Sequence, residues 1–294
     1  MKLENEKHGD AALPGAEDYP ALDEAFLACD KQLIRRTRNI QLIPEARFRR
    51  GGKLSYAEWA HVIGIFQTLI YMHLDDRQNS LILDVGCGTG LLAVASQPFL
   101  GENGKYVGID VSAEYIEFCR AHYSSSEFEF MHLETDNAYY SPGEGDSRLG
   151  WSIESNTVDL TLALSVWTHF NEDDATFYLK EINRVLKPGG KAIVSFFLLD
   201  DLYRTSVSTR SGQTGKFHTM PQNRWIFDQP SYGSTRCFHP SWADVPEQAI
   251  GLTREGLDFI TDASGLKLIE QHNGSWKEVP GIFFQDVMVF QKEH

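Results

Sequence analysis

Short apolar segments alternate with longer amphipathic segments through the middle of the chain. The apolar segments predict strands at 81–85, 106–109, 128–133, 158–164 and 192–198. Between them, the spacing of apolar residues predicts helices at 91–97, 113–122 and 175–186. Pro188, Gly189 and Gly190 follow the last of these helices and are expected to end it. Regular alternation of strands and helices predicts a parallel sheet that is wound on both faces.

This alternation is absent at both ends of the chain. Residues 1–20 are polar and predict a loose arm, whereas 21–43 and 56–74 have the apolar spacing of helices, with Ser55 placed to cap the second. Residues 200–250 contain many aromatic, glycine and proline residues and little periodicity. An irregular segment of that length inside a compact domain is usually functional. A helical pattern then returns at 256–264, and strand patterns return at 266–270 and 286–290.

A glycine-rich turn, Leu-Asp-Val-Gly-Cys-Gly-Thr-Gly at 83–90, joins the first strand to the first helix. Gly86, Gly88 and Gly90 let the backbone turn sharply and approach a ligand closely, because they carry no Cβ. The second strand ends at Asp110, 20 residues after Gly90. An acid in that position is placed to accept hydrogen bonds from ribose hydroxyls. The pattern therefore predicts a site for a nucleotide-containing cofactor.

Two cofactors compete for this site. The G-x-G-x-x-G fingerprint of dinucleotide binding would place its third glycine at position 91, where this chain has Leu91. Asp84 also precedes the glycines, and its carboxylate would repel a pyrophosphate but attract a cation. S-adenosylmethionine carries an ammonium and a sulfonium group. The turn therefore favours S-adenosylmethionine over NAD.

At these residues the chain resembles the class I S-adenosylmethionine-dependent methyltransferases, most closely bacterial small-molecule methyltransferases. The resemblance covers 81–197 well and the C-terminal strands more weakly. Short supporting motifs occur in the family's order and spacing at 130–137, 140–142, 165–170, 184–190, 196–199 and 285–287. Together they are specific for the fold and the cofactor, but not for the methyl acceptor.

The resemblance implies an α/β fold with a Rossmann-like, doubly wound sheet of seven strands, mostly parallel and with an antiparallel last strand. We expect an N-terminal arm and helical cap at 1–75 and a cofactor-binding core at 76–199. Residues 200–250 are interpreted as an insertion after the fifth strand that covers the acceptor pocket. Residues 251–294 are expected to add a closing helix and closing strands to the core.

Cofactor contacts follow from the same resemblance. The glycine turn with Asp84 is expected to hold the methionine half of the cofactor, and Asp110 its ribose. Beside the adenine the family usually has Asp followed by a small or apolar residue, whereas this chain has Glu-Thr-Asp-Asn at 134–137. Glu134 takes the acidic position there, with Asp136 as the alternative. The residues predicted to bind the cofactor are Asp84, Gly86, Cys87, Gly88, Gly90, Asp110, Val111, Glu134, Thr135, Asp136, Ser165 and Val166.

A histidine near the fourth strand is the first candidate for catalysis. Ser165 and Val166 follow that strand, at the point that lies beside the reactive methyl group in class I enzymes. His169 comes soon after, and in some small-molecule methyltransferases a histidine at the matching position is a general base or orients the acceptor. The imidazole pKa lies near neutral pH, which suits that role. The alternative is a histidine that only shapes the turn.

Two further histidines, His218 and His239, are secondary candidates for the base. Metal-dependent relatives have an aspartate just after the fourth strand, where this chain has Ser165. No pair of His or Cys residues shows ligand spacing, so we expect no metal.

The composition limits the partners. A formal net charge of −14 argues against long contacts with nucleic acid, whose phosphates require Lys and Arg. The four cysteines are dispersed without a C-x-x-C pair, which indicates a reducing, cytoplasmic setting. The N-terminus lacks the apolar core of a signal peptide, and no apolar run approaches the roughly 20 residues that span a bilayer. We therefore expect neither nucleic acid nor membrane as a partner, and leave the oligomeric state open.

Positive charge gathers in one part of this acidic chain. Arg204, Arg210, Lys216 and Arg224 lie between positions 202 and 227, where there is no Asp or Glu. They either form a basic surface or recognise a carboxylate or phosphate on the acceptor. In the second case at least one of them is expected to face the pocket.

The sequence thus predicts a metal-independent enzyme that methylates an O-, N- or C-nucleophile of a small molecule, with an anionic acceptor as one hypothesis. A protein or tRNA methyltransferase keeps the same cofactor. A non-catalytic, cofactor-binding partner protein is a rival from another class. An NAD-dependent oxidoreductase is disfavoured by Leu91 and Asp84.

Overall fold

The computed structural model describes residues 24, 38–50, 55–76, 78–134 and 148–293. Its main sheet has the order β3-β2-β1-β4-β5-β10-β9. Strand β10 runs antiparallel to both of its neighbours, and the remaining pairs are parallel. The predicted doubly wound sheet with an antiparallel last strand is confirmed. The strands are β1 (Leu81–Val85), β2 (Lys105–Asp110), β3 (Phe128–His132), β4 (Val158–Ala163), β5 (Leu186–Leu199), β9 (Leu266–His272) and β10 (Asp286–Lys292).

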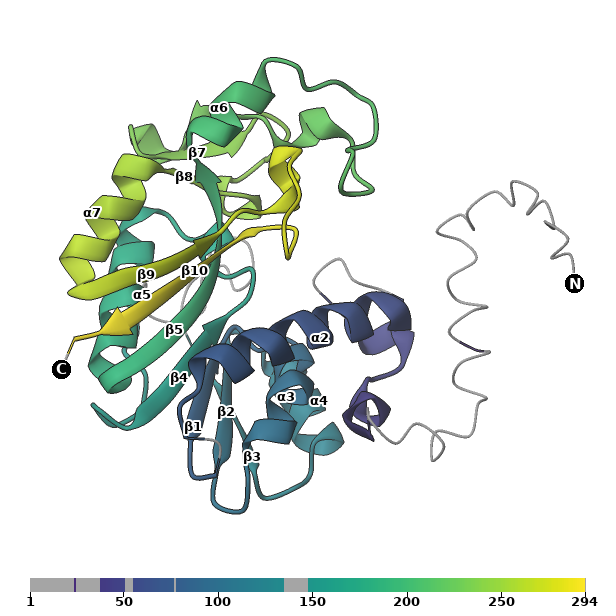
Figure 1. The fold of residues 1–294 in the computed structure, drawn as a ribbon, viewed down its shortest axis with the longest axis vertical. Coiled ribbons are helices and arrows are strands. Elements are labelled where there is room, and N and C mark those ends of the chain that lie inside the picture. The colour runs from purple at the N-terminus through teal and green to yellow at the C-terminus, as the bar shows by residue number, and fades with distance from the viewer. Residues whose placement is uncertain (1–23, 25–37, 51–54, 77, 135–147, 294) are drawn as a thin grey trace, which may run out of the picture.

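Helices cover both faces of this sheet (Figure 1). Strand residues alternate between the two layers: Ile82 packs with one apolar cluster and Leu83 with the other. On the first face lie α2 (Tyr56–His73), α3 (Leu91–Ser96) and α4 (Ala113–His122), and on the second α5 (Glu172–Val185) and α7 (Arg254–Ser264). Among the described helices, none combines the length and apolar character needed to cross a membrane.

Local signals explain where the helices begin. The Ser55 hydroxyl accepts a hydrogen bond from the Glu58 amide at 3.1 Å, and the Glu58 carboxylate accepts one from the Ser55 amide at 3.0 Å. This reciprocal capping box satisfies two amides that the first turn of α2 would leave without partners, and the predicted cap is confirmed. The helix predicted at 21–43 lies largely outside the described residues, and Arg38–Leu42 form a 3-10 helix.

The insertion is more regular than its sequence indicated. It contains α6 (Asp201–Val207), β6 (Phe227–Pro230) and β7 (Cys237–Pro240), and β8 (Gly251–Thr253) follows it. Strand β8 pairs in parallel with the end of β5, and β7 and β6 continue the sheet outward, so that ten strands are joined in all. Strands of three or four residues are too short for an apolar alternation to be recognised in the sequence.

Candidate functional site

The glycine turn has the backbone that its sequence predicts. Gly86, Gly88 and Gly90 have φ angles of 69°, 53° and 88°, in the left-handed region that favours glycine. A Cβ on Gly86 would come within 2.5 Å of Val166, whereas a Cβ on Gly88 would meet nothing within 4 Å. The turn is therefore packed on one side and open at Gly88. That opening leaves room for a ligand directly against the backbone.

Asp110 lies against this turn. Its carboxylate oxygens accept hydrogen bonds from the Gly88 and Ser112 amides, each at 2.8 Å. The surrounding protein displaces water from the carboxylate, which raises the pKa of Asp110. The neighbouring Val111 carbonyl oxygen lies 3.0 Å from Nε2 of His132. The ends of β1 and β2 thus bring the two predicted cofactor contacts, Gly88 and Asp110, together.

Asp84 lies deeper than the sequence suggested. Its side chain is buried in the sheet, and the Tyr106 hydroxyl donates a hydrogen bond to Oδ2 at 2.5 Å. The second oxygen, Oδ1, is buried and has no hydrogen-bond partner in the described part of the chain. Burial raises the pKa of Asp84 to about 8, although the Tyr106 hydrogen bond opposes that rise. Its predicted contact with the methionine half of the cofactor stays a prediction.

The predicted adenine contacts are only partly described. Glu134 is exposed, two residues beyond the end of β3. Thr135 and Asp136 lie outside the described residues. The choice between Glu134 and Asp136 therefore stays open.

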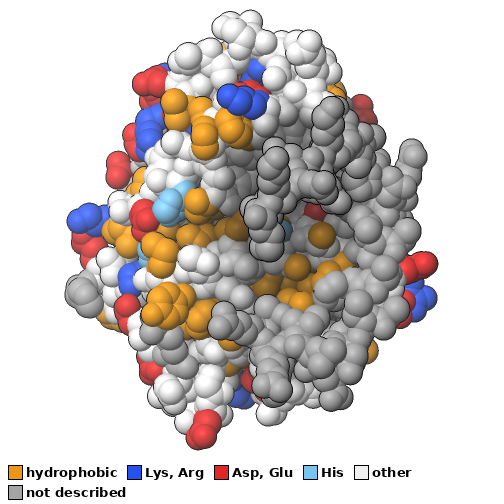
Figure 2. All heavy atoms as spheres, turned by 45° about the vertical axis from the view of Figure 1, so that its right-hand side comes forward, with side chains coloured by type: hydrophobic (Ala, Val, Ile, Leu, Met, Phe, Trp, Pro, Cys, Tyr) orange, Lys and Arg blue, Asp and Glu red, His pale blue; other side chains and the backbone are white. Residues whose placement is uncertain are grey.

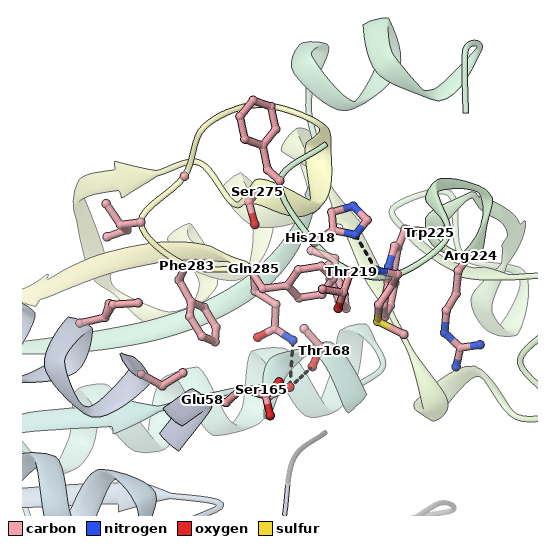
Figure 3. A pocket seen from close by; sticks show the side chains of 18 of the residues that line it. Glu58, Ser165, Thr168, His218, Thr219, Arg224, Trp225, Ser275, Phe283 and Gln285 are labelled. Carbon is pink, nitrogen blue, oxygen red and sulfur yellow. Dashed lines mark hydrogen bonds between the residues drawn. The ribbon is translucent and has the colours of Figure 1, made fainter. Parts of the chain in front are cut away.

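A cavity of about 960 Å³ lies beyond the carboxyl ends of β4 and β5. Its walls come from α2, from the residues after β4, from the insertion and from the segment that leads into β10. Figure 3 shows side chains from these distant parts of the sequence converging on one space. In Figure 2, hydrophobic side chains gather at mid-height on the face shown. Residues of the insertion line this cavity, and their predicted role in covering an acceptor stays a prediction.

Ser165 is held at the base of the cavity by a closed set of hydrogen bonds. Its amide donates to the Ser195 hydroxyl at 2.7 Å, which donates to the Gln285 side-chain oxygen at 2.7 Å. The Gln285 amide group donates back to the Ser165 hydroxyl at 2.8 Å, and Thr168 lies 3.4 Å from that hydroxyl (Figure 3). This network holds Ser165 at a φ of 62°, which is unusual for a residue with a side chain. Sequence reasoning noted the motif at 285–287 but missed this role of Gln285.

His169 also lines the cavity, and its ring has a defined tautomer. Nδ1 lies 2.6 Å from the main-chain oxygen of Glu247. A carbonyl oxygen can only accept, so Nδ1 carries a proton, and in the neutral ring Nε2 carries the lone pair. Burial lowers the pKa of His169, which keeps the ring neutral at physiological pH. These are the properties of a general base, and the predicted role stays a prediction.

The other two candidate histidines have different surroundings. His218 lines the cavity, but its Nε2 lies 2.7 Å from Glu278 and its Nδ1 accepts from the Met220 amide at 3.3 Å. Both of its ring nitrogens are therefore engaged. His239 lies on β7, 3.1 Å from the Ser231 hydroxyl, and is not among the described residues that line the cavity. Within the described ranges, no three His, Cys, Asp or Glu side chains are arranged to hold a metal ion.

The four basic residues between positions 202 and 227 separate in space. Arg204 pairs with Asp201 at 3.0 Å, although no acid lies among these residues in the sequence. Arg210 donates to the main-chain oxygens of Trp225 and Trp276, at 2.5 and 3.0 Å. The Lys216 amine lies over the ring of Phe217. Arg224 alone among the four lines the described cavity wall, and its predicted contact with an anionic acceptor stays a prediction.

Comparison with known proteins agrees with this geometry. Residues 82–190 match the family model of a methyltransferase domain. Demethylmenaquinone methyltransferases of Bacillus cereus and Bacillus anthracis are each 32% identical over 121 residues, which cover 41% of this chain and 46% of theirs. The chain therefore aligns with about half the length of these relatives.

Solved structures share the fold. An S-adenosylmethionine-dependent methyltransferase from Mesorhizobium loti has a TM-score of 0.51 at 14% identity and covers 76% of this chain and 96% of its own. A protein from Pyrococcus horikoshii has a TM-score of 0.53 at 18% identity, and the alignment covers 80% of this chain and 92% of that protein. A geranyl diphosphate C-methyltransferase from Streptomyces coelicolor has a TM-score of 0.50 at 14% identity, and the alignment covers 92% of this chain and 86% of that protein.

Proposed function

We propose that this chain is a class I S-adenosylmethionine-dependent methyltransferase that methylates a small molecule. The match of residues 82–190 to a methyltransferase domain supports this proposal. The observation that carries the proposal is the cavity of about 960 Å³ beyond β4 and β5. Ser165, which lines it, directly precedes Val166, the residue that packs on the glycine turn. A cofactor held by that turn and an acceptor held in the cavity would therefore be neighbours.

S-adenosylmethionine supplies a methyl group that its sulfonium already activates. The chain would hold this cofactor with the open backbone at Gly88 and with the carboxylate of Asp110. Both positions fit, because Gly88 leaves room for a ligand and Asp110 lies within hydrogen-bond distance of its amide. Positioning of the acceptor then accounts for much of the rate, since alignment of two reactants lowers the barrier strongly.

His169 is proposed as the base for an acceptor hydroxyl or protonated amine. Its Nδ1 is held by the Glu247 carbonyl, which orients the ring and leaves Nε2 as the proton-accepting atom. Ser165, through its link to Gln285, presents an oriented hydroxyl to the same cavity. Together they would orient and deprotonate the acceptor without a metal.

A small acceptor is favoured over a protein or a tRNA. The cavity is walled by the insertion and by the segment that leads into β10, which restricts access for a large substrate. The name of the demethylmenaquinone relatives also points to a small molecule with apolar character. The net charge of −14 disfavours nucleic acid, and the dispersed cysteines favour a cytoplasmic setting. Arg224 in the cavity wall supports an acceptor with negative charge.

Calorimetry and methyl-transfer assays test this proposal. The protein is expected to bind S-adenosylmethionine and S-adenosylhomocysteine, and to bind NADH at least a hundredfold more weakly. With methyl-labelled S-adenosylmethionine, label is expected in compounds of a small-molecule extract and not in protein or tRNA fractions. NADH binding without S-adenosylmethionine binding would overturn the cofactor. Label in tRNA or protein would overturn the acceptor class, and cofactor binding without any transfer would favour a non-catalytic partner protein.

A further inference from the structure

Arg224 differs from the other arginines of the insertion because its guanidinium group has no polar partner among the described residues. Its Nε is buried without a hydrogen bond, and no described residue forms an ion pair with the group. The group instead lies 4.0 Å from the centre of the Trp242 ring, and the Trp242 indole donates a hydrogen bond to the Arg224 main-chain oxygen at 2.5 Å. Trp242 thus contacts both the guanidinium group and the main chain of Arg224. The side chain is fixed at the cavity wall rather than swinging freely into solvent.

A partly buried cation without a counter-charge is unfavourable, since it loses hydration without gaining a partner. Arg204 in the same insertion does not carry this cost, because its side chain is 55% exposed and also pairs with Asp201. A guanidinium presents paired N–H groups that match the two oxygens of a carboxylate. The ligand that best complements Arg224 is therefore an anion.

The charges around the cavity limit that anion to one negative charge. Arg224 is the single Lys or Arg among the described lining residues, whereas Glu58 and Asp244 also line the cavity. A phosphate monoester carries between one and two negative charges near pH 7, more than one guanidinium offsets beside two carboxylates. A carboxylate carries one charge and has the geometry of the guanidinium fork.

The cavity wall between Arg224 and the end that holds Ser165 and Thr168 is apolar. In Figure 3, Arg224 lies beyond Trp225, well apart from Ser165 and Thr168. The Phe197 and Trp225 rings are 5.0 Å apart, and the Trp225 and Phe284 rings 5.2 Å apart, and all three residues line the cavity. An acceptor that reaches both ends would lie along these rings.

We propose that the acceptor is a monocarboxylate with an apolar, ring-containing body. Its carboxylate pairs with Arg224, its body lies along Phe197, Trp225 and Phe284, and its nucleophile faces Ser165 and His169. This assignment rests on the proposed methyl transfer, whose acceptor it specifies. Arg224 is then a residue that determines specificity and takes no part in proton transfer.

Three compounds with one common body test the proposal: 6-phenylhexanoate, 6-phenylhexan-1-ol and 6-phenylhexyl phosphate. Their binding to the full chain, saturated with S-adenosylhomocysteine, is followed by quenching of tryptophan fluorescence, because Trp225 and Trp242 line the cavity. The carboxylate is expected to bind at least tenfold more tightly than the alcohol and more tightly than the phosphate. Arg224→Gln is expected to abolish the preference over the alcohol, and Arg224→Lys to reduce it. Arg204→Gln, which removes a paired cation of the same insertion, is expected to preserve it.

Equal binding of carboxylate and alcohol, or no binding of either, would overturn the carboxylate assignment, and so would tighter binding of the phosphate. A preference that survives Arg224→Gln would overturn the role of Arg224. Calorimetry with S-adenosylhomocysteine checks that each variant is folded. Because it reports the cofactor site separately, loss of probe binding with intact cofactor binding rejects this inference alone. Absence of cofactor binding by the unaltered protein rejects the proposed function.

Discussion

His169 and the main chain of Glu247 are joined by a hydrogen bond of 2.6 Å, although 78 residues separate them in the sequence. Glu247 belongs to a short 3-10 helix, Pro246–Gln248, and its buried carboxylate accepts a hydrogen bond from the Tyr232 hydroxyl at 2.7 Å. The insertion therefore lines the cavity and also holds the ring of the histidine that follows β4. In the proposed reaction, acceptor binding and proton transfer would depend on the same segment.

His169→Ala is expected to lower kcat by roughly 10²–10⁴-fold, the usual contribution of a general base. Affinity for S-adenosylhomocysteine, measured by calorimetry, is expected to stay unchanged. His272→Gln, on β9 outside the cavity lining, is the control. If His169→Ala lowers thermal stability but not the rate per folded molecule, His169 is a structural residue, and His218 becomes the next candidate.

The pH profile provides a second test of His169. Burial lowers its pKa from the ordinary value near 6.5, and a base acts in its neutral form. The rate is therefore expected to be constant above pH 6.5 and to fall only as the pH drops through the lowered pKa. The measurement is kcat between pH 5 and pH 8. An acidic limb with a midpoint above 6.5 contradicts the assignment.

Gly88→Val and Asp110→Ala are each expected to weaken S-adenosylmethionine binding at least tenfold, or about 1.4 kcal/mol. The first places a side chain in the open space beside the turn, and the second removes a carboxylate that also holds the Gly88 amide. Gly233→Val is the matched control, because Gly233 also has a positive φ, of 74°, and a Cβ there also meets nothing within 4 Å, but it is not among the described residues that line the cavity. Calorimetry on folded variants checks both, and unchanged affinity in Asp110→Ala would remove Asp110 from the cofactor site.

The stability of the Asp84→Asn variant, relative to that of the unaltered protein, is expected to increase as the pH rises from 5 to 8. The folded pKa of Asp84 is about 8, above the 3.8 of an unperturbed carboxyl group. Between pH 5 and pH 8 the Asp84 carboxyl group is protonated in the folded chain and ionised in the unfolded chain. The unaltered protein therefore loses stability as the pH rises through this range, and the Asn variant does not share that loss. The free energy of unfolding of the Asn variant minus that of the unaltered protein should therefore rise by up to about 1.4 kcal/mol per pH unit. Urea unfolding at pH 5, 6, 7 and 8 measures it, and a constant difference contradicts the raised pKa.

Lys277→Met is expected to lower the free energy of unfolding by about 3–5 kcal/mol. The Lys277 amine is fully buried and lies 2.7 Å from both Asp200 and Asp286, so its loss leaves the buried Asp286 carboxylate and the mostly buried Asp200 carboxylate without a counter-charge. Lys187→Met is the comparison, since its ion pair with Asp159 is partly exposed, with 43% and 20% of the two side chains accessible, and is expected to be worth about 1 kcal/mol or less. Urea unfolding of both variants checks the contrast. Equal decreases in the free energy of unfolding of the two variants would mean that burial does not increase the contribution of the Lys277 ion pairs to stability.

Much of the architecture was readable from the sequence, because its causes are local. The glycines of the turn, the acid at the end of β2 and the capping box at Ser55 act within a few residues of their positions, and the structure has each where it was expected. Alternating strands and helices leave few ways to arrange a parallel sheet. The doubly wound, mostly parallel arrangement of the seven main strands, with an antiparallel last strand, therefore followed from the sequence and its family resemblance.

The cavity was decided by the tertiary structure. Three contacts that define it join distant positions: Ser165 with Gln285, His169 with Glu247, and His218 with Glu278. No periodicity encodes such pairs, since each depends on how loops from different strands meet. The basic residues at 204 and 224 show both cases. Arg204 pairs with Asp201 three residues earlier on α6, which is a local contact, whereas only packing sets Arg224 against Trp242, 18 residues away, in the cavity wall.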